Sequence, residues 1–284
     1  MALTAGNHLQ SNNTASTPDL ISAFVQQYLT ENAVLIPTIL DRSSEAGNNG
    51  SVDYLKFNSG LEAETKTEEG AYTAQRFVVD KDTLTFDKQK GVFVKASTKS
   101  QIQTTLPVEI NVLERSADAL VQQLEADVYA ELRKAQAANR KKLGTKDTLS
   151  LADIFNARKV MNKLFIPMAS RYLAINPDQE TDVLKLENFI HAEKYGTSNN
   201  TVLKNGEIGR IAGFTVVVSN NVAESEVIAY HRDHVVFGRQ YNITWEKDRD
   251  LQYSMTQYLL ETLYGLKVLD SGKKGVLINN LGAL

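Results

Sequence analysis

Between positions 113 and 135 the apolar residues recur every three or four positions, which is the spacing of one face of an amphipathic helix. Ser116 is a suitable N-cap, and basic residues crowd the last turn before Gly144, so the pattern predicts a helix over about 116–142. A helix of this length is roughly 40 Å long, which favours an extended body. The residues of the apolar stripe are Leu113, Ala117, Leu120, Val121, Leu124, Val128, Leu132 and Ala135.

Upstream of this helix the apolar positions alternate, which is the period of a strand. VDYLKF, after Ser51, is predicted to be a strand that ends at Asn58. After a polar stretch we expect three short strands, RFVVD, TLTFD and GVFVKAS, separated by turns at DKD and KQKG. Residues 58–95 thus form an extended β loop with little apolar mass. Isolated ribbons are marginally stable in water, so we expect this one to lie on its own body or on a neighbouring subunit.

The N-terminal residues 1–20 are polar and lack an apolar period, which predicts a flexible arm. A short helix follows within residues 21–41, with Asp19 as its cap. The N-terminus lacks the basic start and long apolar core of a signal peptide, and the apolar runs are too short to span a bilayer. We therefore expect synthesis in the cytosol and no membrane partner.

Beyond Gly144 the pattern predicts a second helix capped by Thr148 or Ser150, and then a strand at KLFIP. YLAINP, a helix over about 178–191, and a turn and strand at GEIGRIAGFTVVVSN come next. The rest is interpreted mostly as strands, although residues 255–264 could equally be helical. The fold class predicted from this order is α+β, and no internal repeat is detectable.

Composition limits the chemistry that this chain can perform. It has no cysteine, which excludes disulfides, thiolate zinc sites and cysteine nucleophiles. A net charge of −3 gives no global attraction to a phosphate backbone, so a dedicated nucleic-acid reader is disfavoured.

Four short patterns resemble functional motifs, and each is incomplete. His231-Arg232-Asp233 matches the start of a protein-kinase catalytic loop, but the other kinase motifs are missing. His231 and His234 lack a third metal ligand, and we interpret them as surface or subunit-boundary histidines. The glycines of GEIGRIAGF have the wrong spacing for a dinucleotide fingerprint, and SGKKG is interpreted as a hairpin turn. We therefore predict no catalytic residue, no cofactor and no metal site.

Charged residues form two local clusters with two possible interpretations. They are either a solvated loop and a helix C-terminus, or complementary surfaces between copies of the chain. The acidic cluster is Glu62, Glu64, Glu68 and Glu69, and the basic cluster is Arg133, Lys134, Arg140, Lys141, Lys142 and Lys146. The candidate inter-subunit contacts are Glu62, Glu64, Lys66, Glu68, Glu69, Arg76, Arg133 and Arg140. More broadly, we expect the first forty residues and residues 58–95 to contact neighbouring copies.

Several segments, taken in order, resemble the HK97-like fold of tailed-phage major capsid proteins. LFIPMASRYLAINP is similar to the "IP…R…P" strand of their axial domains, and NGEIGRIAGFTVVVSNNV is similar to their "G.IG…GF.V..SN.V" segment. IAYHRDHVVFGRQ and LYGLKVL resemble their return strands. The resemblance covers roughly residues 34–280.

This resemblance implies an α+β, HK97-like capsid fold with an N-terminal arm, an extended β loop, a long spine helix, and peripheral and axial domains. The arm would be residues 1–50, the β loop 58–95 and the axial domain 146–235. The peripheral domain would combine 51–57, 96–145 and 236–284, with the spine helix at about 116–142.

The function that the resemblance implies is that of a non-enzymatic major capsid protein. Its copies would form hexamers and pentamers of an icosahedral virion shell, assembled in the bacterial host cytoplasm. The expected partners are other copies, a separate scaffolding protein, a portal, and double-stranded phage DNA bound without sequence specificity. Some relatives crosslink a loop lysine to an asparagine, but nothing pairs Lys56 or Lys66 with Asn279, and we do not predict crosslinking. The alternatives are an encapsulin-like nanocompartment shell, which shares the fold, an uncharacterised cytosolic enzyme, and a monomeric binding module.

Overall fold

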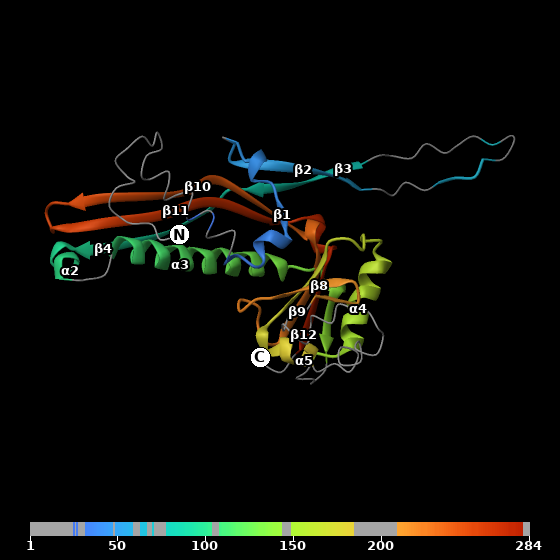
Figure 1. Cartoon of the computed structure of the whole chain (residues 1–284). Helices are drawn as coiled ribbons and strands as arrows, with labels where there is room; N and C mark the ends of the chain where they lie inside the picture. The colour runs from blue at the N-terminus through green and yellow to red at the C-terminus, as the bar shows by residue number, and fades with distance from the viewer. Residues whose placement is uncertain are drawn as a thin grey trace.

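The computed structural model describes residues 25, 27, 32–47, 49–58, 63–66, 70, 78–103, 108–143, 149–184 and 209–280. They form an elongated body, a second lobe at one end of it, and a two-stranded ribbon that runs along the body (Figure 1). Among these residues no helix is both long enough and apolar enough to cross a membrane.

The body is a four-stranded sheet with a long helix along one face (Figure 1). Its strand order is β1 (Leu40–Asp41), β10 (Val235–Asp250), β11 (Met255–Val268) and β4 (Lys88–Ser97). The helix is α3 (Val108–Leu132), and the short α2 (Thr98–Gln103) lies between β4 and α3 in the chain. The apolar stripe of α3 packs on residues of β10 and β11, where Trp245 and Tyr258 stack with ring centroids 5.4 Å apart. Residues 255–264 are therefore strand and not helix.

The spine helix is confirmed, but its predicted ends at 116 and 142 are wrong. It begins two turns earlier, at Val108. The first turns lack a regular apolar stripe, since residues such as Ile110, which is 54% exposed, face outward. It ends at Leu132, after which the chain turns through Ala137–Asn139 into β5 (Arg140–Leu143). β5 pairs in parallel with β12 (Gly275–Asn280). This pairing between distant segments outweighs the local preference of the basic residues for the end of a helix.

The second lobe is a six-stranded sheet in the order β5-β12-β9-β6-β8-β7. The remaining strands are β6 (Arg171–Ile175), β7 (Arg210–Ile211), β8 (Phe214–Val218) and β9 (Glu226–His231). One face packs on α4 (Leu151–Lys163) and α5 (Pro177–Leu184), while the other joins the core around α3. Successive side chains of a strand point to opposite faces, so in β6 Leu173 and Ile175 enter the core beneath α4 and α5, while Ala174 enters the core around α3.

The predicted elements of this lobe are confirmed in part. Ser150 caps α4 and forms a capping box with Asp153, and the turn and strand at residues 210–218 are present. KLFIP is not a strand, because the chain turns at Phe165, which has a φ of 55°. SGKKG is not a hairpin turn, since it joins β11 of one sheet to β12 of the other. α5 ends at Leu184, and residues 185–191 of the predicted helix lie outside the described residues.

The ribbon consists of β2 (Ser51–Asn58) paired antiparallel with β3 (Val78–Thr85). The predicted strand at VDYLKF is confirmed. The predicted turn at DKD is wrong, because residues 80–82 lie inside β3. There Lys81 pairs with Asp53 of β2, and Asp82 pairs with Lys56 of β2. KQKG begins β4 and not a turn, and β4 pairs with β11. Residues 88–95 therefore belong to the sheet of the body and not to the ribbon.

Candidate assembly surfaces

The base of the ribbon packs closely on the body at a pair of glycines. Gly238 of β10 and Gly265 of β11 are directly opposite each other. Leu84 of β3 lies over both, and Phe86, just after β3, lies over Gly238. A Cβ atom on Gly265 would come within 2.2 Å of the Thr85 carbonyl oxygen. Glycine at these positions lets the ribbon approach the sheet closely, on the face opposite α3.

The outward face of the ribbon, which we call the outer ribbon, has a different environment. Leu55 is 66% exposed and Val79 is 45% exposed, and both point to the face that carries Asp53. Lys81 and Thr83 donate to the Asp53 carboxylate at 2.9 and 2.6 Å, and the Thr83 hydrogen bond is the main cause of the lowered pKa of Asp53. This face therefore combines exposed apolar side chains with a small polar network, a composition typical of a protein contact surface.

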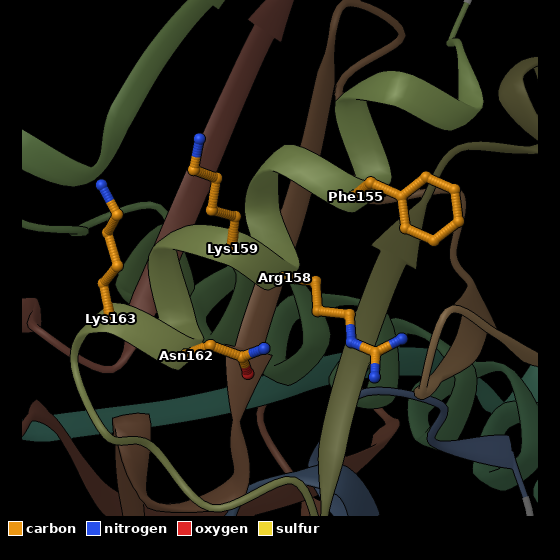
Figure 2. A pocket seen from close by; sticks show the side chains of 5 residues that line it. All are labelled: Phe155, Arg158, Lys159, Asn162 and Lys163. Carbon is orange, nitrogen blue, oxygen red and sulfur yellow. The ribbon is translucent and has the colours of Figure 1, made fainter.

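A second exposed surface lies on α4. Ile154, Ala157 and Met161 face the core at helical spacing, which leaves Phe155, Lys159 and Lys163 on the outer side. Figure 2 shows these three with Arg158 and Asn162 around a shallow hollow. Phe155 is 50% exposed. We call Phe155, Arg158, Lys159 and Lys163 the α4 face.

The loop after α4 is also exposed, and its conformation is fixed from below. Phe165 is 94% exposed and Met168 is 58% exposed. Arg171 is buried beneath the loop and donates to the Pro167 carbonyl oxygen at 2.8 Å, to Asn162 Oδ1 at 2.9 Å and to the Ile166 carbonyl oxygen. The charged guanidinium thus organises the loop, and the apolar side chains remain outside.

Residues 33–39 pack into their own subunit. Leu35 and Ile39 are buried in the core around α3. The buried Glu125 of α3 accepts the backbone N–H groups of Val34, Leu35 and Ile36 at 2.9, 2.8 and 3.3 Å. Burial raises the pKa of Glu125, against the lowering effect of these hydrogen bonds. Residues such as Leu35 and Ile39 are thus used within their own subunit, while Val34 and Pro37 are exposed. The contact of the first forty residues with neighbouring copies stays a prediction, and residues 1–24, 26 and 28–31 lie outside the described residues.

His231 and His234 are buried, so their interpretation as surface histidines is wrong, and a place at a subunit boundary stays a prediction. His234 is fully buried, with Nε2 3.2 Å from the carbonyl oxygen of Leu132 at the end of α3. Burial lowers the pKa of His234 to about 4. Nδ1 of His231 accepts the backbone N–H of Asp233 at 3.2 Å, which caps the turn at Arg232–His234. Within the described ranges, no group of three or more His, Asp or Glu side chains is arranged to hold a metal ion.

Comparison with known proteins now identifies the family. The family model described as phage capsid protein matches residues 66–245, which is more than half of the chain. The chain belongs to this phage capsid family. No curated protein matches it.

Solved structures show the same fold at low sequence identity. The capsid protein superposes on a chain from Mycobacterium phage Che8 with a TM-score of 0.74 and 18% identity, covering 89% of this chain and 93% of that one. The capsid of cyanophage P-SCSP1u gives a TM-score of 0.72 and 12% identity over 99% and 94%. A virus-like particle from Pyrococcus furiosus gives 0.60 and 15% over 93% and 100%.

Together, the family and the fold assign an HK97-like architecture and a structural role. The capsid protein is a shell component of the virion and not an enzyme. The family match favours this reading over the encapsulin-like alternative. The sequence resemblance is thereby confirmed at the level of family, fold class and general function.

The structure places the predicted contact residues in different environments. Arg133 pairs with Glu226 of its own subunit, and Arg140 Nε donates to the Ala135 carbonyl oxygen at 3.0 Å. Glu64 and Lys66 are exposed. Glu62, Glu68, Glu69 and Arg76 lie outside the described residues. Phe165 was not among the predicted contact residues, since KLFIP was predicted to be a strand, and the residues of the α4 face were not among them either.

Proposed function

We propose that copies of the capsid protein form hexamers and pentamers that close into an icosahedral shell around phage double-stranded DNA. The observation that carries this proposal is the ribbon, whose base is anchored on Gly238 and Gly265 while Leu55 and Val79 remain in solvent. A ribbon of this kind gains stability by lying on another copy. Repetition of one such contact around a closed symmetry axis produces rings.

The finer organisation belongs to the same proposal. The arm is residues 1–50, the extended loop begins at residue 58, the axial domain is 146–235, and the peripheral domain is the remainder, with β4 in its sheet. Glu62, Glu64, Lys66, Glu68, Glu69 and Arg76, all in or beside the loop, contact neighbouring subunits. Assembly takes place in the host cytoplasm with a separate scaffolding protein and a portal.

The DNA is enclosed without sequence-specific binding. A net charge of −3 supports this, because a shell gains from an inner surface that does not hold phosphates tightly. Sequence-specific duplex binding by the isolated capsid protein at nanomolar concentration would contradict it.

The test is removal of residues 60–75 from the full-length protein. We expect a soluble, folded monomer that forms no shells, measured by sedimentation velocity and negative-stain microscopy beside the wild type. A second variant carries a Gly/Ser segment of equal length in place of residues 60–75, so that the distance between β2 and β3 is kept. Normal shells from both variants would refute the role of the loop.

The content of purified particles tests the function itself. Particles isolated from infected cells are expected to hold double-stranded DNA that resists nuclease until the shell is opened. A particle filled with one packaged enzyme and no DNA would support the nanocompartment alternative instead.

A further inference from the structure

The α4 face combines cations with exposed aromatic surface. Arg158, Lys159 and Lys163 lie within two turns of one helix, and none of them forms an ion pair within the described part of the chain. Phe155 lies at the edge of the same hollow (Figure 2). Unpaired cations beside exposed aromatic side chains are typical of a surface that is covered by a partner of negative charge.

The loop beyond Lys163 adds a second, independent indication. Phe165 has a φ of 55°, a left-handed conformation that is unfavourable for a bulky residue. Its side chain is 94% exposed and gains almost no burial in its own subunit, although Arg171 holds the backbone of the loop in place. Strained backbone of this kind is concentrated at functional sites. A contact between Phe165 and another molecule would account for this unfavourable conformation.

The same lobe carries an acidic corner formed by Asp178, Glu180 and Glu224. Its two segments are fixed together, since Gln179 Nε2 donates to the Glu224 carbonyl oxygen at 2.6 Å and Asn176 Nδ2 donates to the Val222 carbonyl oxygen at 2.6 Å. Asp178 and Glu224 are exposed, and the three carboxylates make no ion pair with a described residue. α4 and α5 occupy different parts of the lobe in Figure 1.

We propose that the α4 face of one copy docks on the acidic corner of the next copy within a ring, with Phe165 buried in the contact. This inference rests on the proposed assembly into hexamers and pentamers. Two different patches on one chain make a heterologous contact, and a heterologous contact generates a ring when its rotation closes. The opposite charges set the register and disfavour pairing of identical patches.

A phosphate backbone is the other chemistry that three cations would suit. The apolar part of the surface argues against it, because contacts to DNA phosphates gain little from exposed Phe155, Phe165 and Met168. Protein partners bury such side chains. The two occupants make different predictions for assembly and for DNA content, so one set of variants separates them.

The test uses charge reversal in the full-length protein. One variant carries Lys159→Glu and Lys163→Glu, a second carries Asp178→Lys and Glu224→Lys, and a third carries all four. We expect each pair to raise the concentration needed for ring or shell formation roughly tenfold or more, and the third to recover most of the loss. Lys267→Glu, at another exposed lysine without a described ion pair, is the matched control and is expected to assemble like the wild type.

Phe165→Gly separates folding from assembly. Glycine accepts the left-handed backbone, so the thermal midpoint of the isolated subunit is expected to stay the same or rise, while assembly weakens. A fall in the midpoint together with unchanged assembly would assign Phe165 to the fold and overturn its role in the contact.

The outcomes distinguish the two proposals. A wild-type protein that forms no rings or shells refutes the proposed function. A wild type that assembles, beside reversal variants that assemble equally well or are not rescued in combination, refutes only the pairing. Shells that form normally with Lys159→Glu and Lys163→Glu but lose their DNA would assign the α4 face to DNA and overturn the inference.

Discussion

The base of the ribbon, which faces the body, and the outward face of the ribbon belong to the same two strands, yet their apolar side chains have opposite environments. Leu84, near the end of β3, is completely buried over Gly238 and Gly265. Leu55, in the paired strand β2, is 66% exposed. The side chains of a strand alternate between its two faces, and Leu84 lies on the face toward the sheet of the body while Leu55 lies on the opposite face. The face on which a side chain lies therefore determines whether it stabilises the subunit. The remaining apolar residues are available to a neighbour.

The junction of the body and the second lobe resembles the ribbon base in this respect. His234 follows β9, and its ring lies against the last carbonyl of α3 and against Gly275 of β12, where a Cβ atom would be 2.6 Å from the ring. Helix, turn and strand thus meet at one buried imidazole. Changes at the ribbon base and at this junction should affect folding, whereas changes in the outer ribbon should affect assembly.

The largest effect is expected for Gly265→Ala at the ribbon base. The new methyl group would lie 2.2 Å from the Thr85 carbonyl oxygen, which is backbone and cannot move aside as a flexible side chain could. We expect the free energy of unfolding to fall by roughly 3 kcal/mol, the upper part of the range for overpacked sites. Urea denaturation of the unassembled subunit measures this loss.

Gly50→Ala is the matched control for that variant. It makes the same chemical change just before β2, where an added Cβ atom would meet nothing within 4 Å. We expect its stability to differ little from that of the wild type. If both variants were equally stable, close packing at the ribbon base would not contribute to the fold, and the contrast with the outer ribbon would disappear.

The next effect is a pH dependence at the junction. Burial lowers the pKa of His234 to about 4 in the folded chain, while an unfolded histidine titrates near its ordinary value. The unfolded state therefore binds more protons, so the stability from this group is complete above about pH 6.5 and is lost as the pH falls towards 4. Between pH 7 and pH 5 the loss should be about 2 kcal/mol.

His234→Gln isolates this contribution, because glutamine can donate to the Leu132 carbonyl oxygen but does not titrate. The variant is expected to be less stable than the wild type at pH 7, and its stability should vary less between pH 7 and pH 5. The two proteins are compared by denaturation at a series of pH values in one buffer system. Parallel pH profiles would show that another group dominates.

The elements with a strong period could be predicted from the sequence, whereas their ends depended on contacts between distant segments. The stripe around Leu120 and Leu124 specified α3, and Ser150 marked the start of α4. The end of α3 could not be found, because it depends on the pairing of β5 with β12 and on the contact of His234 with Leu132. β4 was assigned to the ribbon for the same reason, since its partner β11 lies far along the chain.

The assembly surfaces were harder to predict than the fold. Alternating residues such as Leu55 look the same in sequence whether their apolar face is buried or exposed. Phe165 was placed in a strand because its neighbours are apolar, whereas the chain turns there with a positive φ and leaves the side chain 94% exposed. Charge clusters were visible, but Arg133 is used within its own subunit, paired with Glu226.

The smallest effect on the subunit is expected at the outer ribbon, with Leu55→Ser. Because this side chain is 66% exposed, its replacement should change the free energy of unfolding by no more than about 0.5 kcal/mol. Shell assembly should nevertheless weaken, because the apolar area that a neighbour would cover is lost. Sedimentation velocity measures assembly, and urea denaturation measures the subunit. A large loss of subunit stability would mean that Leu55 packs within its own chain, and unchanged assembly would show that this part of the ribbon remains uncovered in the shell.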